Sequence, residues 1–173
     1  RRGAAIVYDV RTGEILSFAH APRINNNDRL MAPKNHRLPW GAIDVFEPGS
    51  VLKVFTFAAA LDSGAVTPDT MIDTHGGHLR IADAQISDLK KLKRASVRDV
   101  LRYSSNVGTV EIARSTGQEH LQKMLRKAGF GQPTGLPIPY EASGIAQLSR
   151  RWDPVTFANI AFGQGIAVSA IQL

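Results

Sequence analysis

Cysteine is absent from all 173 residues, which excludes disulfides, thiolate metal sites and a cysteine nucleophile. No apolar run approaches the roughly 20 residues that cross a bilayer, and the first residues do not resemble a signal peptide. Aromatic residues make up only 7% of the chain, too few to predict a surface on which nucleic-acid bases stack. The remaining composition, 43% apolar and 21% charged, is typical of a folded globular domain.

Positive charge is concentrated in one segment. The net charge is +6, and residues 88–102 contain six basic residues against Asp88 and Asp99. The segment matches no DNA-binding or RNA-binding motif, so we expect a solvated face or a contact with an acidic polymer, and no nucleic-acid partner.

Short β-rich and helical patterns share the chain, which indicates an α+β fold. Residues 4–10 and 14–19 predict a hairpin whose turn is Arg11-Thr12-Gly13. A long surface loop is expected over 22–39, and 65–95 lack a clear pattern apart from short β-like pieces. Helices are predicted from Ser50 to residue 63, from Ser96 to about Tyr103, over 107–115 and over 118–128, with a turn at 162–165.

Lys53 is the only charged residue between Val51 and Leu61, in a helix that is apolar on every side and therefore predicted to lie inside the core. Ser50 precedes Lys53 by three residues, so the two side chains share a helical face. A buried lysine loses its proton more easily, and a neutral lysine can activate a serine hydroxyl. The alternative is that Ser50 only caps the helix while Lys53 extends to solvent.

The same spacing recurs at Ser87 and Lys90, but in a polar, highly charged segment where we expect both residues at the surface. A second polar group, Ser104-Ser105-Asn106, interrupts two predicted helices. Its side chains could relay a proton and hold a peptide in a cleft, or one of its serines could simply cap the next helix.

Three blocks together resemble a known family. They are Phe46-Glu47-Pro48-Gly49-Ser50-Val51-Leu52-Lys53, Ser104-Ser105-Asn106-Val107-Gly108, and Phe162-Gly163-Gln164-Gly165 with the residues up to Leu173. In order and spacing they are similar to the transpeptidase domain of class B penicillin-binding proteins, most of all the division-specific septal enzyme. The resemblance implies the penicillin-binding and serine β-lactamase type of α+β fold, an antiparallel sheet with flanking helices and a helical subdomain.

The resemblance also implies a peptidoglycan D,D-transpeptidase that forms an acyl-enzyme on Ser50 and is acylated there by β-lactams. Lys53 would be the base, Ser104 the proton relay, and Asn106 a partner of Lys53 and of the substrate amide. No cofactor or metal is implied. The implied partners are stem peptides, β-lactams, a glycosyltransferase and divisome proteins, at the periplasmic face of the inner membrane.

The family's Lys-Thr/Ser-Gly motif does not occur in residues 1–173. Ser169 and Gln172 form a capping-box pattern that announces a further helix. We therefore expect residues 1–173 to be part of a transpeptidase domain, with the pedestal domain, membrane anchor and C-terminal strands outside this chain. Two other functions stay open, a β-lactamase or β-lactam sensor and a non-catalytic interaction module. His75 and His78 lack further ligands, and the glycines between them favour a turn over a metal site.

Overall fold

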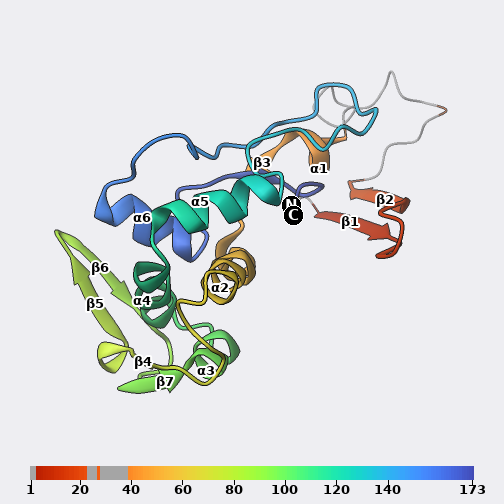
Figure 1. Ribbon diagram of the computed structural model, residues 1–173. Helices are drawn as coiled ribbons and strands as arrows, with labels where there is room; N and C mark the ends of the chain where they lie inside the picture. The colour runs from red at the N-terminus through yellow and green to blue at the C-terminus, as the bar shows by residue number, and fades with distance from the viewer. Residues whose placement is uncertain (1–2, 23–26, 28–38) are drawn as a thin grey trace.

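The computed structural model describes residues 3–22, 27 and 39–173, and its helices and strands are mixed along the chain (Figure 1). The strands are β1 (Gly3–Tyr8), β2 (Ile15–Ala21), β3 (Val45–Phe46), β4 (Met71–Asp73), β5 (His78–Ile81), β6 (Ala84–Ser87), β7 (Arg94–Ser96) and β8 (Val168–Ser169). The α-helices are α1 (Trp40–Ile43), α2 (Lys53–Asp62), α3 (Val97–Arg102), α4 (Asn106–Thr116), α5 (Gln118–Lys127) and α6 (Pro154–Ala161). Residues 39–173 also contain the short 3-10 helices η3 (Gly49–Leu52) and η4 (His75–Gly77). The α+β class predicted from the sequence is confirmed.

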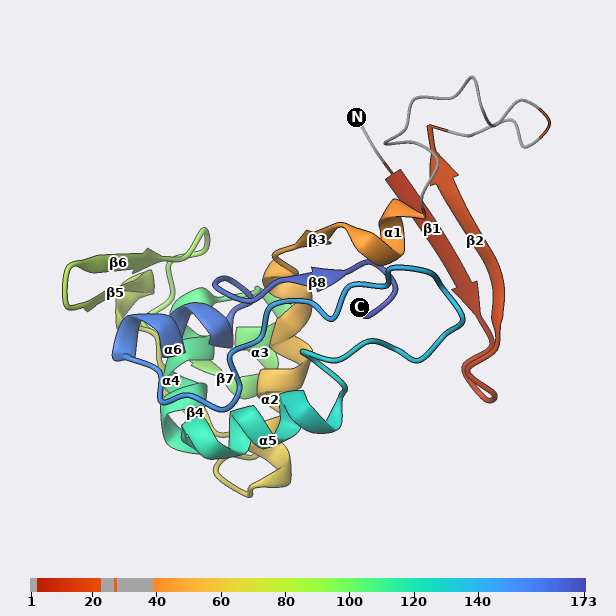
Figure 2. The ribbon, with the colours of Figure 1, turned by 90° about the horizontal axis from the view of Figure 1, so that it is seen from above.

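The strands of the described residues pair in four antiparallel ladders of two strands each, β1 with β2, β3 with β8, β4 with β7, and β5 with β6. The predicted hairpin is confirmed in β1 and β2. Its turn closes with hydrogen bonds from Gly13 N to Asp9 O and from Asp9 N to Glu14 O, and Gly13 has a φ of 74°. The hairpin and the β5–β6 ladder lie at opposite ends of the molecule, with the helices between them (Figure 2).

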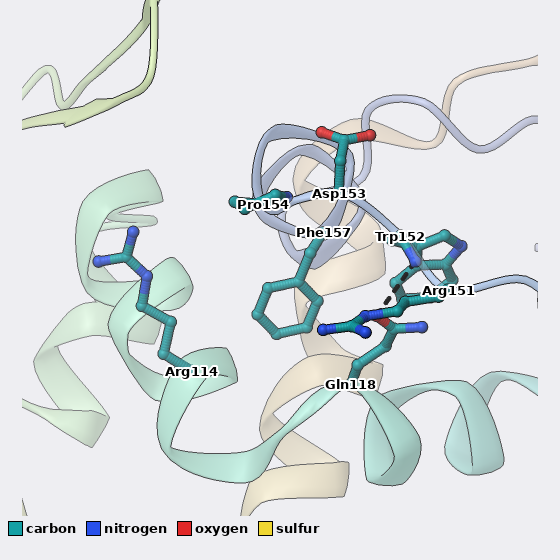
Figure 3. Close-up of a pocket in the computed structure, with 7 residues that line it drawn as sticks. All are labelled: Arg114, Gln118, Arg151, Trp152, Asp153, Pro154 and Phe157. Carbon is teal, nitrogen blue, oxygen red and sulfur yellow. Dashed lines mark hydrogen bonds between the residues drawn. The ribbon is translucent and has the colours of Figure 1, made fainter.

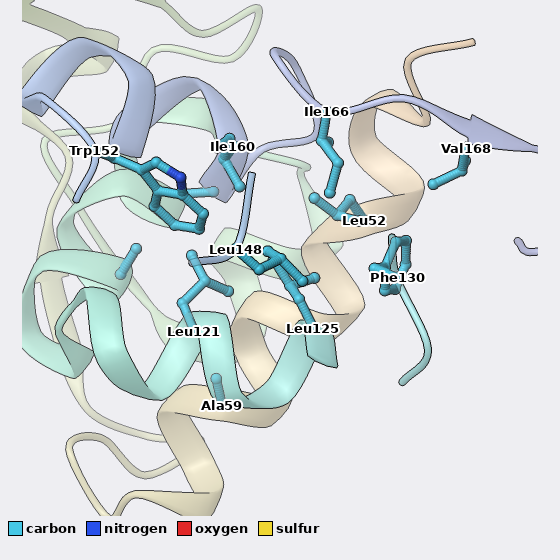
Figure 4. Packing of buried hydrophobic residues seen from close by; sticks show 12 residues of the cluster. Leu52, Ala59, Leu121, Leu125, Phe130, Leu148, Trp152, Ile160, Ile166 and Val168 are labelled. Atoms are coloured by element: carbon cyan, nitrogen blue, oxygen red, sulfur yellow. The ribbon is translucent and has the colours of Figure 1, made fainter. Parts of the chain in front are cut away.

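Helix α2 packs on α4 and α5, and its two buried faces contribute to two different clusters of apolar side chains. Ala59, together with Leu52 at the end of η3, joins the cluster beneath α5 and α6 that Figure 4 shows, with Trp152 at one edge of the cluster. Phe57 and Ala60 join the cluster beneath α3 and the β4–β7 ladder. Burying apolar surface on two sides in this way stabilises α2 in one orientation.

The prediction that α2 is buried on all sides is partly wrong. Val54 and Leu61 are 58% and 43% exposed, because in the described part of the chain the packing partners cover only the other faces of the helix. The helix also begins later than predicted. Residues from Gly49 form a 3-10 turn, in which Lys53 N donates to Ser50 O three residues earlier, and the α-helix starts at Lys53.

The remaining helices have clear end signals. Ser96 caps α3, as predicted, by accepting a hydrogen bond from Asp99 N at 3.2 Å. Asp153 caps α6 through bonds from Val155 N and Thr156 N, both 3.0 Å, and Pro154 occupies the first turn. Helix α6 was not predicted, and neither were the short ladders within 65–95. None of the described helices is long and apolar enough to cross a membrane.

The predicted turn at 162–165 is present, and the capping box after it is half formed, because Gln172 N donates to the backbone oxygen of Ser169 and not to its Oγ. Ser169 N donates to Gln172 Oε1 at 2.9 Å, the reciprocal bond of a capping box. Gln172 Nε2 also donates to the carbonyls of Gln132 and Ser143, which ties the segment after β8 to the long connection between α5 and α6. The surface loop predicted over 22–39 lies outside the described residues except at positions 22, 27 and 39.

Candidate active site

The turn that carries Ser50 is held from outside its own helix. Gly49 N donates to Gly163 O at 2.9 Å, and Gly165 N donates to Glu47 Oε1 at 2.8 Å. Gly163 lies so close that a Cβ added there would stand 1.9 Å from Gly49 O, and both glycines have positive φ. The turn at 162–165 therefore fixes the backbone immediately before Ser50, whose side chain is exposed.

Lys53 lies in the interior at 1% exposure, as the sequence predicts, and its ammonium has a complete set of acceptors. Nζ donates to Ser104 O at 2.6 Å, to Asn106 Oδ1 at 2.7 Å and to Ser104 Oγ at 3.0 Å. An ammonium has three N–H bonds, so these three acceptors use all of them. Residues more than 50 positions apart in the chain are thus joined at one nitrogen.

Burial lowers the pKa of Lys53 from 10.5 to about 8, and the negative charge of Asp88 opposes part of that shift by raising the pKa. Removing a charged amine from water disfavours its protonated form, which is the direction expected for a lysine in an apolar helix. A lysine with a pKa near 8 is neutral in an appreciable fraction of molecules at neutral pH. It can then accept a proton, which an ordinary surface lysine cannot do at that pH.

Within the Ser104-Ser105-Asn106 segment, the side chain of Ser105 caps a helix, and the side chains of Ser104 and Asn106 contact Lys53. Ser105 caps α4, since its Oγ accepts from Gly108 N at 2.8 Å. Ser104 has a φ of 53°, a conformation uncommon for residues other than glycine, and this directs its carbonyl and hydroxyl to Lys53. The capping alternative is therefore confirmed for Ser105, and Ser104 lies against Lys53.

Asp88 was missed by the sequence analysis, which placed its segment at the surface. The residue is only 6% exposed, and its carboxylate accepts hydrogen bonds from Ser105 Oγ, Asn106 N and Val107 N. Its neighbours Ser87 and Lys90 are exposed, as predicted for the second Ser-x-x-Lys copy. In the sequence, Asp88 is a single acidic residue directly after a short β-like run, and this pattern is too weak to predict that the side chain is buried.

The structure brings Lys53, Ser104 and Asn106 together, and Ser50 lies one turn before Lys53. In the part of the chain that the structure describes, no hydrogen bond joins Ser50 Oγ to Lys53 Nζ. This agrees with a protonated Lys53, whose three N–H bonds are already taken. A neutral amine has only two N–H bonds and a lone pair. The two carbonyl acceptors can keep those bonds, which leaves the lone pair for a serine hydroxyl.

A cavity of about 540 Å³ lies elsewhere, where the C-terminal end of α4 meets the starts of α5 and α6 (Figure 3). Arg114, at its rim, is eight residues along α4 from Asn106, or roughly 12 Å at 1.5 Å per residue. Trp152 and Phe157 line the cavity with their rings stacked 6.4 Å apart, and both also pack on the core. The cavity is therefore separate from the group around Lys53.

The turn at His75 and His78 forms as the glycines predict, in η4, with positive φ at Gly76 and Gly77. His75 Nδ1 lies 3.5 Å from Asp73 Oδ1, and His75 Nε2 lies 3.5 Å from Glu111 Oε1, both of which are long contacts. Across residues 3–22, 27 and 39–173, no three His, Asp or Glu side chains are arranged to hold a metal ion.

A serine on a fixed turn, followed one turn later by a buried lysine of lowered pKa, is typical of enzymes that transfer acyl groups through a serine ester. Residues 3–173 match the family described as penicillin binding protein transpeptidase domain, and the chain belongs to that family. The expected resemblance to class B penicillin-binding proteins is confirmed.

Curated relatives match along the whole chain. It is 32% identical over 173 residues to the probable peptidoglycan D,D-transpeptidase PenA of Neisseria gonorrhoeae, and 33% identical over 171 residues to the peptidoglycan D,D-transpeptidase FtsI of Escherichia coli. It covers 29% of the length of each. A solved structure of the transpeptidase domain of Burkholderia pseudomallei penicillin-binding protein 3 superposes with a TM-score of 0.86 at 35% identity, over 99% of this chain and 47% of that one.

Proposed function

We propose that the protein is a peptidoglycan D,D-transpeptidase in which Ser50 forms an acyl-enzyme with the penultimate D-alanine of a stem peptide. The observation that carries the proposal is the contact of Lys53 Nζ with Ser104 and Asn106, in a chain that belongs to the transpeptidase family. The chain spans 29% of the length of the Neisseria gonorrhoeae and Escherichia coli relatives. The activity named for those proteins therefore supports the proposal and does not by itself establish it.

In the proposed reaction, neutral Lys53 takes the proton of Ser50 Oγ as that oxygen bonds to the substrate carbonyl carbon. The tetrahedral intermediate then collapses, the carbon–nitrogen bond to the terminal D-alanine breaks, and its amine needs a proton. Ser104 Oγ, 3.0 Å from Lys53 Nζ, can pass the proton of Lys53 to that amine. An amine of a second strand then attacks the ester carbonyl, the bond from Ser50 Oγ to the carbonyl carbon breaks, and the proton lost by the amine passes through Lys53 to Ser50 Oγ.

Asn106 has a separate part in the proposal. Its Oδ1 orients Lys53 at 2.7 Å, and its Nδ2 is directed at a carbonyl, that of Ser87, at 3.5 Å. So long a bond is readily exchanged for a substrate carbonyl. Ser50 N–H, near the start of η3, is proposed as one oxyanion donor, because the first N–H groups of a helix lack partners within it.

The finer assignments follow from the family alone. They are a septal role in division, glycosyltransferase and divisome partners, and a location at the periplasmic face of the inner membrane. The division of the whole protein into a pedestal, an anchor and a transpeptidase domain that includes residues 1–173 is a proposal of the same kind.

Turnover tests the proposed reaction. The protein encoded by the complete reading frame containing these residues is incubated with a stem pentapeptide ending in D-Ala-D-Ala and an amine acceptor. The proposal predicts release of D-alanine with formation of the acyl-transfer product, and loss of both with Ser50→Ala. Rapid hydrolysis of benzylpenicillin would instead indicate a β-lactamase. Absence of both D-alanine release and a penicillin adduct would indicate an interaction module.

A further inference from the structure

Asp88 lies outside the residues to which the proposed reaction gives a role, yet it touches the segment that holds Lys53 at three points. Its Oδ2 accepts from Ser105 Oγ at 2.5 Å, and its Oδ1 accepts from Asn106 N at 2.6 Å and from Val107 N at 3.0 Å. These are the cap and the first two residues of α4. A negatively charged carboxylate at the N-terminus of α4 also interacts favourably with the positive end of the helix dipole.

The position of Asp88 is itself fixed. Asp88 N donates to Gly77 O at 3.0 Å, and Lys91 Nζ donates to the same carbonyl at 3.3 Å. Gly77 packs so tightly that a Cβ there would lie 2.9 Å from Lys91 Cδ and 3.3 Å from Asp88 Cβ. A continuous set of contacts therefore runs from η4 through Asp88 to the start of α4, and from there to Lys53.

We propose that Asp88 is a positioning residue of the active site, whose carboxylate fixes Ser105 and Asn106 and thereby sets where Lys53 is held. The inference rests on the proposed function. It assigns to Asp88 no contact with substrate. The carboxylate acts through the N-terminus of α4 and through its charge.

Several other charged or titratable groups belong to the elements packed around Asp88. They are Lys90 and Lys91 on the same loop, His75 and His78 on η4 and β5, Arg102 at the end of α3 with Tyr103 after it, and Glu111 on α4. Lys90 is exposed, and its Nζ lies 3.3 Å from the centre of the Tyr103 ring. Of the charges in the described residues, Asp88 is the one that raises the pKa of Lys53.

Asp88→Asn is the sharpest test, because it keeps the size of the side chain and removes only its charge. An amide oxygen can still accept from the two backbone N–H groups, and the amide nitrogen can donate to Ser105 Oγ. Asp99→Asn is the matched control. It neutralises another helix-start carboxylate, one that contacts Ser96 rather than α4.

Two readouts are measured for each variant. The first is the rate of Ser50 acylation by benzylpenicillin from pH 6 to 10. The second is the pKa of Lys53, measured by an NMR titration of protein with isotope-labelled lysine. The Lys53 signal is identified as the one that is missing in Lys53→Arg. With Asp88→Asn we expect the acylation plateau to fall by about tenfold, the scale of one charge-assisted hydrogen bond. Both midpoints should move to lower pH, because a charge that favours the ammonium is lost. Asp99→Asn should change neither.

Ser105→Ala separates the effect of the position of the Asp88 carboxylate from the effect of its charge. It removes one contact of the carboxylate but keeps its charge, so the plateau should fall while the midpoints stay. If Asp88→Asn does not fold, Asp88→Glu replaces it, with displaced oxygens and the charge retained, and the same result as Ser105→Ala is expected. A lower plateau with unmoved midpoints in Asp88→Asn, or wild-type behaviour in both readouts, would overturn the inference.

The two proposals fail differently. If the wild-type protein is not acylated, the proposed function fails, and the Lys53 titration still decides whether Asp88 acts on the lysine. If the wild type is acylated but Asp88→Asn matches it at every pH, the inference about Asp88 fails and the proposed function stands.

Discussion

Acylation of Ser50 should rise with pH through the pKa of Lys53, since only the neutral amine can take the serine proton. With a pKa of about 8, roughly a tenth of Lys53 is neutral at pH 7 and about nine tenths at pH 9. The rate constant is therefore expected to increase about tenfold between these pH values and then level off. An ordinary lysine with a pKa of 10.5 would be neutral in about one molecule in 3,000 at pH 7. Burial thus raises the active fraction by about 300-fold.

The assay is the second-order rate constant for acylation by benzylpenicillin, followed by intact mass at pH 6 to 10. Lys53→Arg should abolish acylation over the whole range, because arginine keeps its proton. Lys123→Arg, a change at an exposed lysine of α5, should leave the profile as in the wild type. A rate that is flat from pH 6 to 9, or that still rises nearly tenfold per pH unit between pH 9 and 10, would refute the role of a buried, neutral lysine.

Two further predictions concern the packing that holds the site. Gly163→Ala should lower the free energy of unfolding by about 3 kcal/mol or more, because its Cβ would stand 1.9 Å from Gly49 O. Gly129→Ala, also at positive φ but with open space around it, should cost only about 1 kcal/mol, and equal losses in urea unfolding would argue against the clash. Thr56→Val should cost about 1–3 kcal/mol, because it leaves Ala161 O without the 2.7 Å bond from Thr56 Oγ1. An unchanged urea midpoint for this variant would show that the bond contributes little.

Features set by neighbours in the chain were predictable. The β1–β2 hairpin follows from two β-rich runs and a glycine turn, and the ends of α3, α4 and α5 follow from local caps and from the amphipathic pattern. The burial of Lys53 was predictable because no other charge interrupts its apolar helix. The strands from β4 to β7 could not be predicted, because runs of three or four residues are too short to show the alternation of apolar and polar side chains typical of a strand. Helix α6 had a usable signal in Asp153-Pro154, an N-cap followed by proline at the first position.

Features set by distant residues could not be predicted from pattern alone. The partners of Lys53 lie more than 50 residues away, and their identity came from a family resemblance, not from spacing. The burial of Asp88 depends on α4 beginning against the loop between β6 and β7, a contact between segments 17 to 19 residues apart. A short, polar, basic segment is ordinarily a solvated face, and only the packing on α4 makes this carboxylate an exception.

The central claim is that Ser50 is an acylated nucleophile, and one measurement tests it directly. The protein and its Ser50→Ala variant are incubated with benzylpenicillin, and the intact mass of each is followed over time. We expect one slowly decaying adduct of the mass of penicillin on the wild type, located on the peptide that contains Ser50, and none on the variant. An adduct that persists in Ser50→Ala, or a wild type that gains no mass while it remains folded, would contradict the account.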